Sequence, residues 1–442
     1  MRSSRTLDRL SVTFDDDHAV DHAGLLLAAT LGQHLGLPGL VGDRVTAGPH
    51  AVDKVLTVVH SLLAGGDCID DVDALRAAST GVVIGHRVAA PSTVGTFLRS
   101  FTPGHVGQLD RVNGDLLARA WAVEAPHTSS VIDIDSTLCE TFGLAKDGAR
   151  QVMRTGRRGY HPLVAVEAGT GDVVHARLRR GRSNDGTGAA RFVTQALTRV
   201  HRAGGAAVTV RADSGFYQGD VIAAIRRAGA RFSIGARIQT GMRRLIEAIP
   251  ADAWTPIDYP YGDGAAVAEL AWDAFAGTGA DRTSGRSPDA VTVRLIVRRV
   301  PPSPGLQLPL FPVFSYHPFI TDLDGTPVEL DEFHRRHAEI ENTIKDLKHG
   351  MGLNHFPSGR WGANGAWLAC NVLAHNLARW VARLGLNDRA SMTKTIRRRY
   401  LAVPGRLTRS ARKLRLHLPT RWPWATQFLA ALDRLRTLHP SG

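Results

Sequence analysis

The first 125 residues place apolar side chains at the spacing of helices rather than of strands. Residues 22–37 and 51–66 repeat Leu, Val and Ala every three or four positions, with Gly near the end of each run. Pro91-Ser92-Thr93 has the form of a helix start. We therefore predict an N-terminal helical domain over residues 1–125, either a helix-turn-helix-like unit or a plain helical bundle.

After residue 126 the period of the pattern changes from helix to strand. Residues 129–137, 161–171 and 173–181 are β-rich, and Gly-Thr-Gly-Asp joins the second and third runs like a hairpin turn. Helical and strand patterns then alternate, with helices predicted over 188–202 and 218–229 and strands over 206–216 and 231–238. A strand meander followed by helix, strand, helix and strand predicts an α/β fold, an RNase H-like mixed sheet with flanking helices.

Residues 239–314 lose this rhythm. They contain Gly, Pro and short β-type runs, and we interpret them as a β-rich insertion that divides the catalytic core into residues 126–238 and 315–385. The second part begins with a strand at 316–323. It ends with a strongly apolar helix that stops before Gly385, and we expect this helix to pack against the sheet.

Composition identifies the class of partner. The chain has 442 residues with 43% hydrophobic content, enough for two or three domains, and 54 Lys and Arg against 41 Asp and Glu give a net charge of +13. Such a charge favours DNA over a membrane as the partner. Because no apolar run reaches about 18 residues and the start lacks a signal-peptide pattern, we predict a cytoplasmic, nucleoid-associated protein. The three cysteines show no CxxC spacing.

The last segment, residues 386–442, is strongly basic. Residues 391–421 contain ten Lys or Arg and no acid, which is typical of a phosphate-contacting segment, although a solvated basic tail is the alternative. Three consecutive arginines on a helix span about 200°, so one or two of them can face a single DNA surface. The candidate DNA contacts in this segment are Arg397, Arg398, Arg399, Arg412 and Lys413.

A helix predicted over residues 332–348 carries an acidic residue at the edge of its apolar stripe. The stripe is formed by Phe333, His337, Ile340, Ile344 and Leu347. Glu341 lies about 80° from its centre, with Lys348 two turns further on. Taken alone, this pattern favours a solvated Glu and Lys pair.

Three carboxylates are expected to converge. Asp135 ends the first predicted strand and Asp213 ends the fourth, and these strands are neighbours in the predicted sheet. With Glu341 they supply the oxygen ligands that Mg²⁺ prefers, and two such ions can activate the attacking hydroxyl and stabilise the leaving oxygen at a phosphodiester. Asp133 shares a strand face with Asp135, and we interpret it as a hydrogen-bonded strand residue rather than a metal ligand.

The sequence around these residues resembles the DDE transposases of insertion sequences, most closely the group typed by insertion sequence 1380. The matching blocks are 135–137, 211–216 and 337–360. The resemblance implies a β-strand insertion between the second Asp and the Glu, two bound Mg²⁺ ions with Mn²⁺ as a substitute, and cut-and-paste transposition. It implies a homodimer acting on terminal inverted repeats and target DNA, with residues 1–125 as the end-binding domain.

The wider group of these transposases has a Tyr, Arg, Glu, Lys signature on the glutamate helix. Glu341 and Lys348 match it, whereas His334 and His337 stand where Tyr and Arg are expected. Arg336 is placed to reach DNA instead. The resemblance therefore implies DNA contacts by Lys348, Arg336, His337 and His334.

Two other functions stay open: an RNase H-like nuclease not engaged in transposition, and a catalytically decayed DNA-binding protein. The acidic triad argues against the second. A nucleotide-binding oxidoreductase is disfavoured because the glycine pattern at 186–191 is incomplete and follows a meander. The absence of HExxH disfavours a zinc hydrolase.

Overall fold

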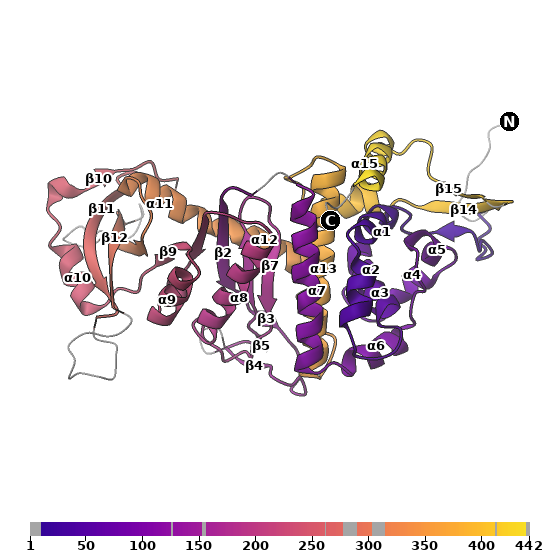
Figure 1. Cartoon of the computed structure of the whole chain (residues 1–442), viewed down its shortest axis with the longest axis horizontal. Helices are drawn as coiled ribbons and strands as arrows, with labels where there is room; N and C mark the ends of the chain where they lie inside the picture. Colours follow the sequence, from indigo (N-terminus) through magenta and orange to yellow (C-terminus); the bar gives the residue numbers. More distant parts are fainter. Residues whose placement is uncertain are drawn as a thin grey trace.

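The computed structural model describes residues 10–124, 127–152, 156–260, 262–276, 290–302, 314–411 and 413–438. The molecule is elongated, with three regions along its long axis (Figure 1). Strands β10 to β12 lie at one end and a mixed sheet with its helices lies in the middle. The N-terminal helices lie at the other end together with the C-terminal elements.

A nine-stranded sheet forms the centre, in the order β10-β11-β12-β13-β9-β8-β2-β6-β7. Its central strands are β2 (Ser130–Ser136), β6 (Leu163–Glu167), β7 (Val173–Arg177), β8 (Val208–Ala212) and β9 (Arg231–Gly235). β2, β6 and β7 form an antiparallel meander, whereas β8 runs parallel to β2 and β9 runs parallel to β8. The flanking helices are α8 (Ala189–Arg202) and α9 (Gly219–Arg227). The predicted mixed α/β fold is confirmed.

The segment interpreted as an insertion continues the same sheet. It contributes helix α10 (Thr240–Glu247) and strands β10 (Thr255–Pro256), β11 (Ala266–Ala274) and β12 (Val291–Val300). Strand β13 (Ser315–Thr321) pairs with β12 on one side and with β9 on the other. One hydrogen-bonded sheet therefore connects the insertion to the strands that carry the candidate site.

The N-terminal region is built from seven helices in the described part of the chain. They are α1 (Leu25–His34), α2 (Leu37–Arg44), α3 (Ala51–Ala64), α4 (Val72–Arg76), α5 (Thr80–Ile84), α6 (Pro91–Arg99) and α7 (Pro103–Ala122). No described helix is by itself long and apolar enough to cross a membrane, and α1 and α2, bent by 62° at their junction, meet that criterion only as a pair.

Helix α13 (Trp361–Trp380) joins the sheet to the N-terminal helices. It packs against β7, as expected, but also against α7 and α3. Its residues are buried on all sides, which accounts for its continuous apolar pattern. A π-helical turn, Val381–Gly385, extends it by about one turn.

The basic C-terminal segment is folded. It forms α14 (Thr393–Ile396), a π-helical turn (Arg397–Leu401), a hairpin of β14 (Gly405–Ser410) and β15 (Lys413–His417), and α15 (Ala425–Thr437). Strand β14 pairs with β1 (Ala19–Val20), and α15 packs against α1. Elements near the two ends of the described chain therefore pack together. The basic side chains of this segment are mostly exposed, so both a phosphate-contacting role and a solvated basic surface stay open.

The glutamate helix is not the single helix that the pattern predicted. Helix α11 (Pro327–Arg335) begins earlier, at a capping box between Thr326 and Glu329, and a 3-10 turn (Arg336–Glu339) separates it from α12 (Ile340–Gly350). The carbonyl of Phe333 accepts a 2.7 Å hydrogen bond from the Arg211 guanidinium just before the 3-10 turn begins. This long-range bond marks the break, and the apolar period alone does not reveal it.

Candidate active site

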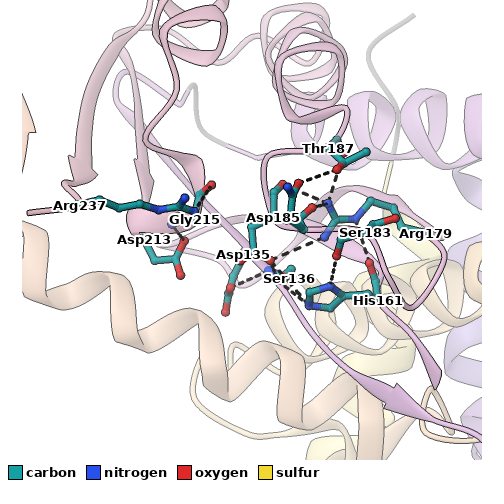
Figure 2. A network of polar contacts seen from close by, with 11 residues as sticks. Asp135, Ser136, His161, Arg179, Ser183, Asp185, Thr187, Asp213, Gly215 and Arg237 are labelled. Carbon is teal, nitrogen blue, oxygen red and sulfur yellow. Dashed lines mark hydrogen bonds and ion pairs between the residues drawn. The ribbon is translucent and has the colours of Figure 1, made fainter. Parts of the chain in front are cut away.

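Two aspartates leave the sheet side by side. In the parallel pair of β2 and β8, Ile134 lies opposite Ala212, so Asp135 and Asp213 are the next residues on each strand. Figure 2 shows both carboxylates on the same side of the sheet edge. The Asp135 carboxylate accepts the Ser136 amide at 2.6 Å, and β2 continues through Ser136. The Asp213 carboxylate accepts the Gly215 amide at 2.9 Å and caps the 3-10 turn Ser214–Phe216.

The third carboxylate comes from helix α12, which packs against β2 and β6. Glu341 is exposed in the first turn of this helix. It lines a cavity of about 1000 Å³ together with Asp213. The other walls of this cavity come from the end of β9, from β13 and from the 3-10 turn before α12. Asp213 and Glu341 therefore share one solvent-filled space at the edge of the sheet.

The electrostatic environment makes these carboxylates reluctant to ionise. Burial raises the pKa of Asp135 to about 6, and the negative charges of Asp213 and Asp185 add to the rise, while the Ser136 amide and His337 oppose it. Partial desolvation likewise raises the pKa of Asp213, against the opposing Gly215 amide. A cation among these groups would relieve both the desolvation and the repulsion.

A buried ion pair between Asp133 and Arg211 lies on the same two strands, two residues before Asp135 and Asp213. The Arg211 guanidinium donates two 2.8 Å hydrogen bonds to the Asp133 carboxylate, and both side chains are at most 2% exposed. His337 Nδ1 lies 3.1 Å from Asp133 Oδ1, and Arg211 also stacks over the Phe333 ring. The interpretation of Asp133 as a hydrogen-bonded strand residue is consistent with these contacts, which tie the glutamate segment to the sheet.

Sequence reasoning missed a fourth carboxylate, Asp185, in the loop between β7 and α8. Its carboxylate accepts a hydrogen bond from the Ser136 hydroxyl and lies 3.7 Å from His161 Nε2 (Figure 2). A Cβ on Gly215 would come within 2.7 Å of Asp185 Oδ2, so the loop packs directly against the turn after Asp213. The sequence did contain a sign of this residue: Asp185 lies in the glycine-rich loop 184–188, which follows the last strand of the predicted meander.

Arg179 holds this loop in place from below. Its guanidinium donates to the backbone carbonyls of Asn184 and Asp185 at 2.7 and 3.0 Å, and to that of His161 at 2.9 Å. His161 in turn contacts the Ser136 hydroxyl at 3.0 Å. The network in Figure 2 therefore connects the residue after Asp135 to the loop that carries Asp185.

The predicted contacts on the glutamate segment have different environments. Arg336 is exposed and pairs with Glu339 at 3.0 Å, while Lys348 is half-buried and donates to the Leu138 carbonyl at 2.8 Å. His334 bonds to Ser233 at 2.8 Å and stacks on Phe319, with ring centroids 4.2 Å apart. Burial lowers the pKa of His334 to about 3, so this side chain is neutral near pH 7 and brings no positive charge to DNA.

The three consecutive arginines do not all face the same way: one points into the protein and two are exposed, which fits the helical spacing. Arg397 donates to the carbonyls of Leu62 and Leu63 at 2.9 and 2.7 Å, inside the N-terminal region. Arg398 and Arg399 are exposed, and Arg399 lies over the Trp424 ring. The Arg397 guanidinium therefore binds carbonyl groups in the last turn of α3 instead of facing solvent. Lys413 is exposed at the start of β15, and Arg412 lies outside the described residues.

The donor set suits divalent cations of the hard, oxygen-binding type. Around one Mg²⁺ at about 2.1 Å, ligand atoms lie at most about 4.2 Å apart. Among the described residues, Asp67, Cys68 and Asp71 form a group whose possible ligand atoms all lie within 4.8 Å of one another. Asp135, Asp213 and Glu341 do not all come within 4.8 Å of one another in the described structure. Asp71 caps its own loop by accepting the amides of Asp67 and Cys68.

The family comparison decides the identity of the protein. The model of the transposase DDE domain, group 1, matches residues 4–440. The chain belongs to this DDE transposase family. Members of the family act in DNA transposition and recombination, which implies nuclease and transesterification chemistry, and they generally use divalent metal ions.

A solved structure is also similar to this transposase. It is the piggyBac transposase synaptic complex with hairpin DNA, with a TM-score of 0.45 and 10% sequence identity. The similarity covers 86% of this chain and 79% of that chain. No curated protein matches the chain.

Proposed function

We propose that this transposase cleaves DNA at the ends of an insertion sequence and joins the ends to target DNA by a cut-and-paste reaction. The observation that carries the proposal is the side-by-side exit of Asp135 and Asp213 from parallel strands, with Asp213 lining the same cavity as Glu341. The raised pKa values of the two aspartates support a role in cation binding. The group typed by insertion sequence 1380 is the subfamily we propose.

The strand order supports an RNase H-like core. The meander β7-β6-β2 followed by the parallel strands β8 and β9 places the ends of β2 and β8 together at the middle of the five strands. This order supports a site formed by carboxylates at these two strand ends and a third on α12, which packs against β2.

When bound, two Mg²⁺ or Mn²⁺ ions would polarise the scissile phosphodiester and lower the pKa of the attacking water or 3′-hydroxyl. Asp135, Asp213 and Glu341 would hold these ions. The Asp133 and Arg211 pair keeps the glutamate segment in register with the strands through Phe333. The hydrogen bond between Ser136 and Asp185 holds the end of β2 next to Asp135.

The cavity wall has positive charge that can bind the DNA strand. Arg237 donates to the Ser214 carbonyl at 2.9 Å, next to Asp213, and lines the cavity. Arg336 lines the same cavity on the side of Glu341. These guanidinium groups are placed to bind the phosphates that flank the scissile bond.

We propose that the N-terminal helices and the folded basic C-terminal segment form the surface that holds the element end. Both lie in one region, joined by the pairing of β1 with β14. Exposed Arg398 and Arg399 would contact the DNA backbone there, and Lys348 would do so near the site. The proposed assembly on two DNA ends is a homodimer.

The test uses purified protein, duplexes carrying the DNA that flanks the coding region, and Mg²⁺ or Mn²⁺. Wild-type protein should nick these duplexes and join the released ends to a plasmid, while Asp135→Asn, Asp213→Asn and Glu341→Gln should lose at least about 100-fold in rate and still bind DNA. Glu247→Gln, an exposed carboxylate on α10 that does not line the cavity, is the control and should keep the wild-type rate.

The outcomes distinguish the candidate functions. Nicking without joining would indicate a nuclease that does not transpose. Binding without metal-dependent nicking by the wild type would indicate a decayed DNA-binding protein. Cleavage by Asp135→Asn at the wild-type rate would overturn the assignment of the site.

A further inference from the structure

The β14 and β15 hairpin has two chemically different faces. Its register pairs Arg406 with His417, Thr408 with Arg415 and Ser410 with Lys413, and side chains of these three pairs share one face. Leu407 and Leu416 belong to the opposite face and pack against Val20 and Ala23 of the N-terminal segment. One face therefore attaches the hairpin to the body, and the other presents only polar and basic side chains.

The polar face has two cations that the fold does not use. Arg406 pairs with Asp16 at 3.3 Å, and Thr408 Oγ1 bonds to His417 Nε2 at 2.8 Å. Lys413 and Arg415 are exposed, and within the described residues neither makes a hydrogen bond or an ion pair through its side chain. A basic side chain that stabilises nothing in the fold is available for an anionic partner.

The hairpin projects from the end of the molecule. In Figure 1 it extends beyond the N-terminal helices at the right-hand end, on the opposite side of α7 and α13 from the strands of the candidate site. Its longer strand has six residues, which corresponds to about 20 Å at 3.4 Å per residue. β15 is the outer strand of the three-stranded sheet, so no further strand covers it in the described chain.

These dimensions fit one nucleic-acid feature. The major groove of B-DNA is about 12 Å wide and admits a two-stranded β-ribbon. A ribbon that lies in the groove with its polar face inward directs the side chains of that face at base edges. Lys413 and Arg415 are two residues, or about 6.8 Å, apart on one strand, so they would face base pairs about two steps apart. Arginine bound to guanine O6 and N7 is the commonest specific contact.

We infer that the β14 and β15 hairpin is a DNA-reading ribbon that enters the major groove of the element end and recognises its sequence through Arg415 and Lys413. The inference rests on the proposed function, because it assigns the partner as duplex DNA. It differs from the backbone role of Arg398 and Arg399, which contributes affinity without sequence preference. The base pairs read by the ribbon are distinct from those at the cleaved bond.

The test compares two substitutions that remove the same charge from opposite faces of one hairpin. Arg415→Ala alters the polar face, and Arg409→Ala alters the exposed position opposite Leu414 on the other face. A preferred duplex is selected from a random 30-base-pair pool with wild-type protein. Its affinity is then compared with that of a shuffled duplex of the same composition, for each variant and for Lys413→Ala.

Arg415→Ala should lose about 10-fold or more of the preference for the selected duplex, because a bidentate base contact is worth about 1–3 kcal/mol. Arg409→Ala should keep the preference and weaken both duplexes equally. Guanine N7 methylation, which blocks the major groove, should interfere with the binding of wild type and Arg409→Ala. The interference at the base read by Arg415 should be absent in Arg415→Ala.

Equal loss in both variants, or interference by adenine N3 rather than guanine N7 methylation, would overturn the ribbon assignment. Metal-dependent nicking of unselected plasmid DNA by each variant is measured in parallel. If the wild type selects a duplex but never nicks DNA, the proposed function fails while the ribbon stands. If nicking is intact and no duplex is selected, only the ribbon fails.

Discussion

Asp133 and Asp135 are two residues apart on the same strand, but one carboxylate has a counter-ion and the other has none in the described chain. Asp133 is buried and fully neutralised by the two hydrogen bonds from Arg211. Asp135 has no guanidinium partner in the described chain. Its burial raises its pKa to about 6, and the negative charges of Asp213 and Asp185 add to the rise. The fold therefore provides a counter-ion for the structural aspartate and withholds one from the residue that we assign to cation binding. This difference is what a metal site without its metal should show.

The largest expected effect comes from breaking the neutralised pair. Asp133→Asn leaves the Arg211 guanidinium buried without its counter-ion, and such losses cost about 3–5 kcal/mol of unfolding free energy. Denaturation in urea measures the change. Asp73→Asn, in the exposed ion pair with Arg76, is the control and should cost less than about 1 kcal/mol. Equal effects of the two changes would mean that the buried pair is not structural.

Removing the charge of Asp135, which has no counter-ion in the described chain, should raise the free energy of unfolding rather than lower it. A folded pKa of about 6 for Asp135, against about 3.8 unfolded, means that stability is present below pH 3.8 and is lost as the pH rises to 6 and beyond. Asp135→Asn should therefore stabilise the metal-free protein at pH 8 by up to about 3 kcal/mol, with no gain near pH 3.5.

Thermal unfolding at several pH values measures this gain. Adding Mn²⁺ at pH 8 should raise the melting temperature of the wild type and leave that of Asp135→Asn nearly unchanged. A variant that is less stable than the wild type at pH 8 without metal would contradict the unneutralised state of Asp135.

A smaller effect is expected from the loop that supports the site. Ser136→Ala removes one hydrogen bond to Asp185, worth about 1 kcal/mol, and should slow DNA cleavage about 10-fold with DNA affinity unchanged. Asp185→Asn keeps an acceptor for Ser136 and removes a negative charge, so it should lower the pKa of Asp135 in the metal-free protein, as followed by NMR titration. An unchanged pKa in Asp185→Asn would show that the loop is too far away to act on Asp135.

The smallest expected change concerns the exposed arginines. Changing Arg398 and Arg399 together to Ala should reduce the slope of log affinity against log salt by about one to two, equally for specific and nonspecific DNA. Arg397 is left unchanged because its guanidinium stabilises the packing of α3. A loss confined to the selected duplex would assign base contacts to these residues.

The main strands of the central sheet and the position of two carboxylates could be predicted because both depend on local patterns. The change of period at residue 129 locates β2 and a buried-type apolar run locates β8, and the polar residues at the end of each strand locate Asp135 and Asp213. Their proximity then follows from strand order. The break before α12 could not be predicted, because the bond from Arg211 to Phe333 joins residues far apart in sequence.

The remaining features depend on contacts between residues far apart in the sequence, so they could not be predicted from local patterns. Arg397 looked like a DNA contact in a basic run, but its partners are carbonyls of Leu62 and Leu63 in α3. Asp185 was not predicted as a site residue, because only the approach of its loop to Gly215 makes it part of the site. The basic segment was predicted without its hairpin, because a short strand pair is stabilised here by pairing with β1 from the start of the chain.

The most direct test of the account is the position of Mn²⁺ in a crystal of the wild-type protein, located by its anomalous scattering. We predict ions in contact with the Asp135 and Asp213 carboxylates at about 2.1–2.2 Å, with Glu341 completing the site. An ion bound only at Asp67, Cys68 and Asp71, with the cavity beside Asp213 unoccupied at saturating Mn²⁺, would contradict the assignment.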